Sequence, residues 1–365
     1  MKILYDHQTF SVQEFGGISR YFYEVISRIK KYSGFSAELS LLFSNNHYLN
    51  ESFKYHRFFP HHKFKGKVRI MTMINRYYSI HNLKNSDFDI FHPTYYEPYF
   101  LKYLNKKTFV LTVYDMIHEK YSNYFGRRDK TSEYKYLLCQ KAKKIIAISN
   151  NTKKDLIEIF KIPDSKIDVV YLAGEIKIEK TGNIETNLST NYILYVGNRG
   201  GYKNYEFFVK AISPLLVRNR ELNILCAGGN NFSDKEKSLF DELNIRNQVL
   251  YFKVMSDNEI AQLYKNAICF VFPSLYEGFG IPILEAFSCG CPVLLSNTSS
   301  FPEVAGEAGL YFEPYDKISI RNAIEKIIAD RDLRTALIKK GYERLKLFSW
   351  DITAEKTKKV YENVY

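Results

Sequence analysis

The chain has 365 residues, of which 45% are hydrophobic and 25% are charged, and its formal net charge is +12. These values are ordinary for a globular protein, and the length favours two domains over a single core. No apolar run reaches the ~18 residues that cross a bilayer, and the N-terminus does not resemble a signal peptide. The odd count of 5 cysteines favours reduced thiols in a cytoplasmic protein over a disulfide framework.

The positive charge is concentrated in the first half of the chain. Residues 1–180 contain 30 Lys and Arg against 18 Asp and Glu, whereas residues 181–365 contain 22 of each. A solvated, lysine-rich surface would explain this pattern, and so would a face for anionic lipid or a diphosphate-bearing acceptor. No nucleic-acid motif is present, so no nucleic-acid partner is expected. We expect peripheral contact with an anionic membrane, at the inner face of the cytoplasmic membrane.

The first half alternates apolar strands with helices. Strands are expected at Lys2–Tyr5, Ala37–Phe43, Phe88–His92, Phe109–Val113, Lys144–Ile148 and Val169–Leu172. Helices are expected over Tyr21–Ile29 and from Asn150, by side-chain capping, to Phe160. Residues 55–80 are interpreted as helix plus mobile loop. The alternation predicts a mostly parallel α/β domain over residues 1–172.

The same alternation restarts after a polar segment. Residues 173–190 have few apolar residues and are predicted to be a linker. Strands are expected at Tyr192–Val196, Leu222–Ala227, Val249–Phe252, Ala267–Phe272, Pro292–Ser296 and Gly309–Phe312. Helices are expected at Asn204–Leu216, Asp257–Tyr264 and Ile318–Leu347. A second Rossmann-like domain is predicted over residues 191–350, and a last helix, about 351–365, is expected to pack back on the first domain.

Two glutamates eight positions apart frame the most informative segment. Glu277 and Glu285 enclose two glycines, a phenylalanine and a proline, directly after an apolar strand. Proline suits the first turn of a helix, so a helix is expected to begin near Pro282. A helix N-terminus attracts anions such as a diphosphate, and a carboxylate on each side suits hydroxyl groups. The segment therefore predicts a site for a sugar nucleotide.

A glycine-rich loop with two cations follows the first strand of the second half. Arg199 and Lys203 could neutralise a diphosphate as its bond breaks. A surface turn with incidental basic residues is the alternative. The loop matches neither a P-loop nor the dinucleotide fingerprint. Cys289 and Cys291 are too close in sequence for a tetrahedral zinc pair, and no metal is expected.

Taken together, these motifs resemble the retaining glycosyltransferases of the family-4 type. The resemblance rests on Gly16-Gly17, on Arg199 with Lys203, on Glu277 with Glu285, and on the segment Phe301 to Gly306. It implies the GT-B fold, with two facing Rossmann-like doubly wound domains and a central cleft. It also implies metal-independent transfer without a cofactor, in which the leaving phosphate helps to deprotonate the acceptor hydroxyl.

The resemblance also implies roles for individual residues. Arg199 and Lys203 would hold the donor diphosphate, and Glu277 would contact the hydroxyls of the donor sugar. Glu285 would accept hydrogen bonds from the ribose, and Gly16 and Gly17 would let a loop close over the diphosphate. The backbone against sugar and phosphate would be that of Gly278, Phe279, Gly280 and Ile281.

One position departs from the family pattern. Many relatives carry His-Asp after the strand that here ends at Val113, whereas this chain has Tyr114-Asp115. Asp115 and His118, three residues on, are hypothesised to shape the acceptor site or to steady the sugar. A packing role for His118 is the alternative, and His7 and His92 are weaker candidates for the site.

The function expected is transfer of a hexose, with retention, from a nucleotide-diphosphate sugar to a glycan or polyprenyl-diphosphate-linked glycan in surface polysaccharide or O-antigen assembly. Mannose is favoured, with GDP-mannose ahead of a UDP-sugar. Two alternatives stay open. One is a GT-B-like nucleotide-sugar epimerase or phosphorylase. The other is a catalytically idle scaffold protein that binds a nucleotide sugar.

Overall fold

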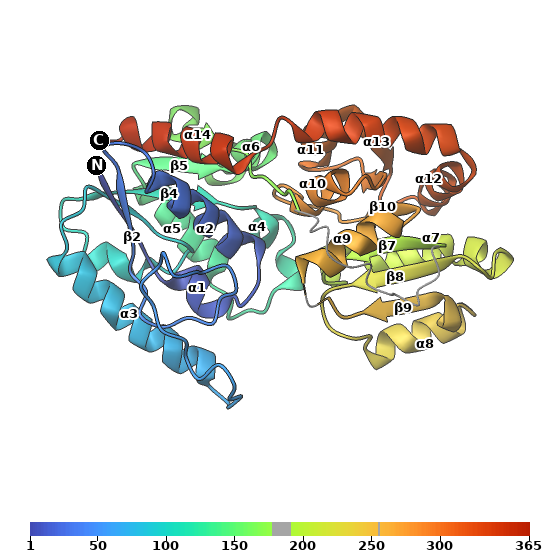
Figure 1. Ribbon diagram of the computed structural model, residues 1–365, viewed down its shortest axis with the longest axis horizontal. Coiled ribbons are helices and arrows are strands. Elements are labelled where there is room, and N and C mark those ends of the chain that lie inside the picture. Colours follow the sequence, from blue (N-terminus) through green and yellow to red (C-terminus); the bar gives the residue numbers. More distant parts are fainter. Residues whose placement is uncertain (177–190, 255) are drawn as a thin grey trace. The chain divides into compact units, whose positions relative to one another are not determined.

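The computed structural model describes residues 1–176, 191–254 and 256–365. Its contacts divide the chain into two compact units, coloured along the sequence in Figure 1. Unit 1 comprises Met1–Leu172 together with Trp350–Tyr365, and unit 2 comprises Ala173–Ser349. Most of the linker predicted over 173–190 lies outside the described residues, which stop at 176 and resume at 191.

Unit 1 is built on a sheet of six parallel strands in the order β2-β1-β3-β4-β5-β6. The strands are β1 (Lys2–Tyr5), β2 (Ser36–Leu39), β3 (Ile90–His92), β4 (Thr108–Val113), β5 (Lys144–Ala147) and β6 (Ile167–Val169). The central strands are apolar at nearly every position, which is the pattern of a parallel sheet covered on both faces. All six strands therefore present their carboxyl ends at one edge.

The helices of unit 1 connect these strands. They are α1 (Gln8–Val12), α2 (Gly17–Ile29), α3 (Lys67–Asn85), α4 (Ile117–Lys120), α5 (Thr131–Lys141), α6 (Asn150–Phe160) and α14 (Trp350–Glu362), with 3₁₀ turns η1 (Pro98–Lys102), η2 (Ser122–Tyr124) and η3 (Asp164–Lys166). Helix α2 is strongly amphipathic, and its buried side includes Tyr21, Phe22 and Val25. It lies against α14, which returns from the far end of the sequence (Figure 1).

The return of α14 is fixed by polar groups in the core of unit 1. The Tyr361 hydroxyl lies 2.8 Å from the Tyr5 hydroxyl and 2.6 Å from Nδ1 of His92. The other ring nitrogen of His92 lies 2.9 Å from the Thr112 hydroxyl. These groups are fully buried or nearly so, and a satisfied buried network of this kind specifies one docking position for the helix.

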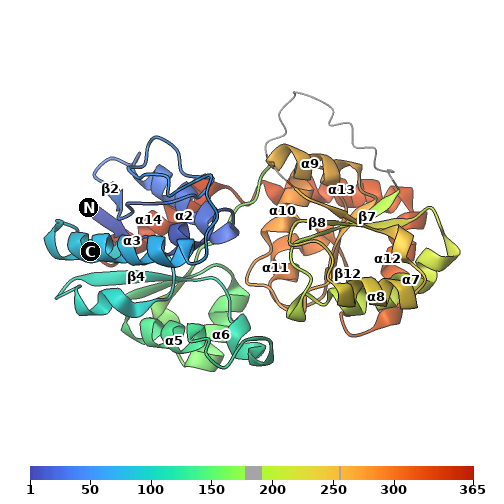
Figure 2. The same cartoon turned by 90° about the horizontal axis from the view of Figure 1, so that it is seen from below.

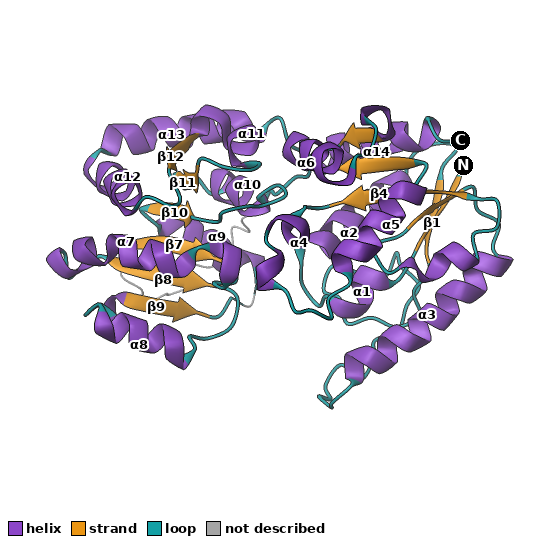
Figure 3. Cartoon of the chain, turned by 180° about the vertical axis from the view of Figure 1, so that it is seen from behind, coloured by secondary structure: helices purple, strands orange, loops and turns teal. Residues whose placement is uncertain are grey.

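Unit 2 repeats the architecture with strand order β12-β11-β10-β7-β8-β9, again all parallel (Figure 3). The strands are β7 (Tyr192–Val196), β8 (Asn223–Ala227), β9 (Val249–Phe252), β10 (Cys269–Phe272), β11 (Val293–Ser296) and β12 (Gly309–Phe312). Crossovers through helices place β10, which precedes the Glu277 segment, directly beside β7, which precedes the Arg199 loop. The two motifs thus meet at the carboxyl edge of this sheet.

The helices of unit 2 cover its sheet (Figure 2). They are α7 (Tyr205–Arg218), α8 (Asp234–Glu242), α9 (Asp257–Asn266), α10 (Ile281–Ser288), α11 (Phe301–Ala305), α12 (Lys317–Ala329) and α13 (Arg331–Leu345), with 3₁₀ turns η4 (Gly201–Lys203), η5 (Arg246–Gln248) and η6 (Gly306–Ala308). Phe208, Ile212 and Ile324 lie in one continuous hydrophobic core. Within the described residues, none of the helices is both long enough and apolar enough to pass through a membrane.

The structure confirms most predicted elements and corrects several. The cap of α6 is Ser149, whose hydroxyl accepts from the Thr152 N–H, rather than Asn150. The strand expected at Val169–Leu172 is β6, which spans Ile167–Val169 and so shares only Val169 with the prediction. The helix expected over Ile318–Leu347 is two helices, because Asp330 caps a new one by accepting from Leu333. Helices α1, α4, α5, α8 and α11 were not predicted.

Candidate functional site

The segment after β10 forms a tight turn that ends at a helix. Gly280 precedes α10 with φ of 101°, a left-handed conformation. A Cβ on Gly280 would lie 3.0 Å from Ile283 Cδ1 and 3.3 Å from Phe301 Cε1, so glycine is required both by backbone conformation and by space. Ile281 and Pro282 open the helix, close to the predicted start.

A serine turn holds the backbone of this segment. Ser299, itself at φ 54°, accepts from the Glu277 N–H at 2.9 Å and donates to the Glu277 carbonyl at 2.9 Å. The fully buried Ser300 hydroxyl lies 2.9 Å from the carbonyls of both Glu277 and Phe279. The course of the backbone from Glu277 to Gly280 is therefore fixed before any ligand binds, which is the condition for preorganised contacts.

Lys203 and Glu277 form an ion pair at the carboxyl edge of the sheet. The Lys203 Nζ donates to Glu277 Oε1 at 2.6 Å, and the two side chains are 20% and 13% exposed. Lys203 ends η4 after β7, and Glu277 follows β10, so neighbouring strands bring together residues that are 74 positions apart. The pair offers a cation and a hydroxyl-binding carboxylate at one place.

Arg199 takes a different position from Lys203. Its guanidinium donates to Glu236 Oε1 at 2.6 Å and to the Asn230 carbonyl at 2.6 Å, and it lies 4.8 Å from the centre of the Phe232 ring. The side chain is only 7% exposed. Burial raises the pKa of Glu236, but hydrogen bonds from Arg199 and Ser233 outweigh this and hold that pKa below its usual value. In this structure Arg199 fastens its loop to the segment 230–236.

Glu285 lies on α10 beside Tyr264 of α9. The Tyr264 hydroxyl donates to Glu285 Oε2 at 3.4 Å, and burial followed by the nearby Glu285 charge raises the pKa of Tyr264 well above its usual value. Glu285 lies about one helical turn beyond the opening of α10, where Gly278, Phe279 and Gly280 lead in. The two glutamates of the motif thus belong to one turn-and-helix unit but have different partners.

In unit 1, Gly17 is the first residue of α2 and Gly16 directly precedes it. A Cβ on Gly16 would lie 2.4 Å from Gln13 Oε1. That same Gln13 oxygen accepts from the Ser19 N–H at 3.1 Å. The loop before α2 is therefore folded over the Gln13 side chain, whose amide end would have to move to admit a Cβ at position 16.

Asp115 and His118 follow β4 in unit 1 and face different neighbours. Asp115 Oδ1 accepts from the Ile117 N–H at 3.0 Å. The His118 ring stacks on Phe125, with ring centres 3.8 Å apart, and its Nε2 lies 3.5 Å from Asp129. Among the residues that the structure describes, no hydrogen bond joins Asp115 to His118.

A buried lysine that the sequence motifs did not reveal supports this loop. Lys135 of α5 is fully buried and donates to the Asp115 carbonyl at 2.9 Å and to Glu119 Oε2 at 2.9 Å. A buried charge is stable only when it is paired and hydrogen-bonded, as here. The backbone at Asp115 is thus held by a cation from another helix.

A further polar group at this edge was also missed. Asp6, directly after β1, is fully buried and accepts from the Thr94 N–H and hydroxyl, both at 2.8 Å. Burial raises the pKa of Asp6, although these hydrogen bonds act against the shift. Its place immediately after an apolar strand is the signal that could have identified it.

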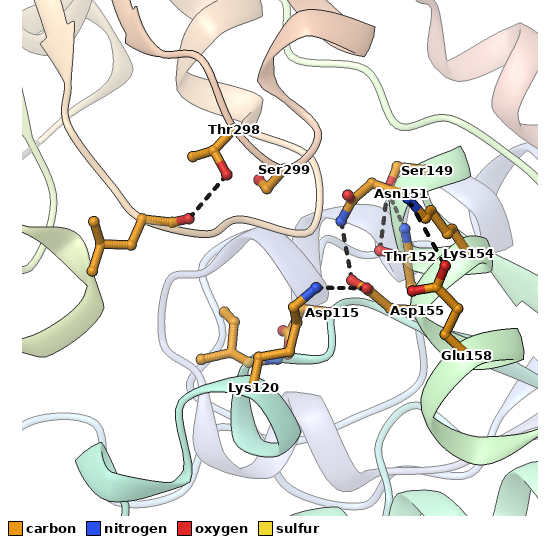
Figure 4. Close-up of polar contacts among 12 residues, drawn as sticks. Asp115, Lys120, Ser149, Asn151, Thr152, Lys154, Asp155, Glu158, Thr298 and Ser299 are labelled. Carbon is orange, nitrogen blue, oxygen red and sulfur yellow. Dashed lines mark hydrogen bonds and ion pairs between the residues drawn. The ribbon is translucent and has the colours of Figure 1, made fainter. Parts of the chain in front are cut away.

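Lys120 and Asp155 form a second ion pair near the carboxyl ends of β4 and β5 (Figure 4). Lys120 Nζ lies 2.7 Å from Asp155 Oδ1, and Asn151 donates to Asp155 Oδ2 at 3.2 Å. Asp155 is almost fully buried, whereas Lys120 is partly exposed.

Tyr114, which stands where many family members have a histidine, is buried, and its hydroxyl donates to the Thr94 carbonyl at 3.0 Å.

The sequence matches two domain models in succession. The model described as Glycosyltransferase Family 4 matches residues 15–173, and the model described as Glycosyl transferases group 1 matches residues 177–344. O-antigen chain mannosyltransferase B of Escherichia coli is 31% identical over 231 residues, which cover 60% of this chain and 61% of that protein. O-antigen chain mannosyltransferase RfbU of Salmonella typhimurium is 29% identical over 188 residues, or 52% of each chain. The alignments thus span 61% or less of the length of these two relatives.

Solved structures share the whole fold at low sequence identity. Sucrose-phosphate synthase from Thermosynechococcus elongatus matches with a TM-score of 0.80 at 19% identity, covering 100% of this chain and 98% of that one. WaaG, a glycosyltransferase involved in lipopolysaccharide biosynthesis, matches with a TM-score of 0.72 at 16% identity, covering 99% of each. The fold is accordingly GT-B, with two Rossmann-like domains. Since the two domain models also follow one another along nearly the whole sequence, the chain belongs to the glycosyltransferases of the family-4 type.

Proposed function

We propose that this protein transfers a hexose, with mannose favoured, from a nucleoside-diphosphate sugar to a glycan or lipid-linked glycan acceptor in surface polysaccharide assembly. The observation that carries the proposal is the Lys203–Glu277 ion pair at the opening of α10. The similarity to O-antigen mannosyltransferases supports mannose as the sugar and a growing glycan as the acceptor. In the proposal the reaction proceeds with retention, without a metal, and the acceptor is reached at an anionic membrane.

The residues of the site have separate roles in this proposal. Lys203 leaves Glu277 to neutralise the diphosphate as the sugar departs, and Glu277 then accepts hydrogen bonds from the sugar hydroxyls. Such electrostatic stabilisation of developing charge is the main catalytic term in many enzymes. Glu285 binds the ribose. Arg199, held by Glu236, braces the loop that carries Lys203 and adds its charge to the field at the diphosphate.

A thermal-shift panel of GDP-, UDP- and ADP-sugars tests the donor site. A donor at about 100 times its dissociation constant should add roughly 2.7 kcal/mol to the unfolding free energy of unit 2. GDP-mannose is expected to give the largest shift. If none of the three classes stabilises the protein, the assignment of the donor site is wrong.

Glu277→Gln tests turnover. This variant keeps the shape of the side chain but removes the charge, so we expect kcat/KM to fall by about 10²–10³, as for other lost electrostatic contacts in a reacting centre. Glu307→Gln is the matched control, because Glu307 is 89% exposed and pairs with Lys340 at the surface. Equal rates for both variants would contradict the proposed role. Release of nucleotide without any acceptor-dependent product would favour the epimerase or phosphorylase alternative.

A further inference from the structure

The segment that leads into α3, together with α3 itself, has a composition unlike the rest of the chain. Residues 52–86 contain 8 Lys and Arg and no Asp or Glu. Figures 1 and 3 show the N-terminal end of α3 and the turn before it projecting from the rest of unit 1. A segment of 35 residues without a single acid is a strong, local source of positive potential.

Helix α3 is attached to unit 1 by three buried polar side chains as well as by the buried apolar residues Met71 and Leu83. The buried Asn75 amide accepts from the Leu42 and Phe43 N–H groups at 3.1 and 2.8 Å and donates to the Phe43 carbonyl at 2.7 Å. The buried Ser79 accepts from the Tyr99 hydroxyl at 2.8 Å, and Asn82 donates to the Ser40 hydroxyl at 2.8 Å. These bonds satisfy the buried polar groups and fix the rotation of the helix.

The opposite side of the helix presents apolar side chains to solvent. Ile70, Met73 and Tyr77 recur at intervals of three and four residues, so they share one side of α3, and they are 41%, 51% and 69% exposed. Phe64, in the turn just before α3, is 42% exposed. Helix α3 thus leaves apolar residues exposed on the side away from its buried amides, and such exposure marks an interaction surface.

Cations lie among these exposed apolar groups. Lys63 and Lys65 flank Phe64, and Arg69 precedes Ile70; all three cations are exposed. We call the surface formed by Lys63, Phe64, Lys65, Arg69, Ile70, Met73 and Tyr77 the α3 face. Apolar side chains between Lys and Arg, on a helix without acids, match the boundary between the anionic headgroups and the acyl chains of a bilayer.

We propose that the α3 face docks unit 1 on an anionic lipid bilayer. Phe64, Ile70, Met73 and Tyr77 enter the interface, while the cations contact the headgroups and extend their chains toward the surface. The absence of acids from the segment favours lipid over a second copy of this chain, because two such faces would repel each other. The proposal goes beyond sugar transfer by naming the surface through which the protein would reach a lipid-linked acceptor.

Co-sedimentation of the full-length protein with vesicles tests the proposal. The vesicles are phosphatidylcholine alone or phosphatidylcholine with about a third phosphatidylglycerol, at low and physiological salt. We expect binding only to the anionic vesicles, weakening as salt rises. The charge variant K63Q/K65Q/R69Q should bind roughly a hundredfold more weakly, and the apolar variant I70S/M73S/Y77S at least about tenfold more weakly.

Two matched variants elsewhere on unit 1 serve as controls. R127Q/R128Q/K130Q removes the same charge from another exposed segment, and Y124S/I159S removes exposed apolar groups. Both should bind as the unaltered protein does. Trp350 fluorescence in urea confirms that each variant is folded, and donor turnover with a soluble acceptor should be unchanged in all of them. This readout separates failure of the docking proposal from failure of the proposed function.

Three results would overturn the proposal. The first is equal binding to neutral and anionic vesicles. The second is unchanged binding of both face variants. The third is a dimer, seen by analytical ultracentrifugation, that I70S/M73S/Y77S abolishes while the unaltered protein binds no vesicle, since the face would then be a self-association surface.

Discussion

Two buried histidines of unit 1 make its stability depend on pH in a predictable direction. His92 has both ring nitrogens in hydrogen bonds, to Tyr361 and Thr112, and His7 lies at hydrogen-bond distance from Ser11. Burial lowers the pKa of each to about 3 from the ordinary value of 6.5, and for His7 the charge of Arg76 adds to the effect. Both rings are therefore neutral in the folded protein near neutral pH, so neither His7 nor His92 is suited to act there as a protonated acid.

The sign and size of the effect follow from these pKa values. Because the folded-state pKa is the lower one, the unfolded chain binds more protons between about pH 3 and 6.5, and stability is lost as pH falls through this window. Each histidine should cost about 2 kcal/mol between pH 7 and pH 5, at 1.36 kcal/mol per unit of pKa difference. Asp6, whose pKa burial raises, acts in the opposite direction: its contribution to stability is gained as pH falls through the raised folded-state pKa and is complete below its ordinary value of 3.8.

Urea unfolding followed by tryptophan fluorescence measures this effect. Trp350 is the sole tryptophan of the chain and opens α14, so it reports on unit 1. His92→Gln keeps a hydrogen-bond donor and an acceptor but cannot titrate. Asp6 is present in both proteins, so its contribution cancels when the pH dependence of the variant is compared with that of the unaltered protein. We expect the loss of stability between pH 7 and pH 5 to be about 2 kcal/mol smaller in His92→Gln. An identical pH dependence in the two proteins would refute the reasoning.

Three further variants probe the supports of the site. Gly280→Ala places a Cβ at φ 101° and 3.0 Å from Ile283, so it should destabilise unit 2 by about 1–3 kcal/mol in calorimetry, whereas Gly126→Ala, with no atom within 4 Å, should not. Lys135→Met leaves the Glu119 carboxylate, which is 3% exposed, without its cation, and should destabilise unit 1 by about 3–5 kcal/mol in the Trp350 assay. Adding Glu119→Gln to that variant should recover much of the loss; no recovery would mean that the charge is unimportant. Ser300→Ala removes the bonds to the Glu277 and Phe279 carbonyls, and should cost about 1–3 kcal/mol and reduce the stabilisation of unit 2 by donor.

The strands and the main helices could be predicted because their signals are local. Each strand of a parallel sheet is a short apolar run, and α2 shows its buried side directly in the spacing of Tyr21, Phe22 and Val25. Helix α8 was missed although its first turn carries a capping box, in which Ser233 and Glu236 satisfy each other's backbone. Helix α5 offers little pattern, because its buried residues include Lys135. A buried lysine is intelligible only once its partners on α4 and in the preceding loop are known.

Within the site, what could be predicted was the chemistry of each motif and not the choice of partners. The Glu277 turn and the start of α10 follow from glycine and proline at fixed positions. The dependence of that turn on Ser299 and Ser300 could not be predicted in this way, since these residues come from the loop after a neighbouring strand. Hydrogen bonds between loops depend on which strands are adjacent, and that order is a property of the whole sheet.

In the loop after β7, two similar basic residues have different roles. Arg199 and Lys203 are four positions apart in the sequence, yet Arg199 pairs with Glu236 and is 7% exposed, whereas Lys203 pairs with Glu277 and is 20% exposed. A guanidinium donates in several directions at once, and Arg199 uses this to join the Asn230 carbonyl and Glu236. A lysine ammonium is a compact charge on a flexible chain, which can exchange one anionic partner for another. The physical difference between the two side chains therefore supports a bracing role for Arg199, and in the proposed function it leaves Lys203 as the cation that would move from Glu277 to the diphosphate.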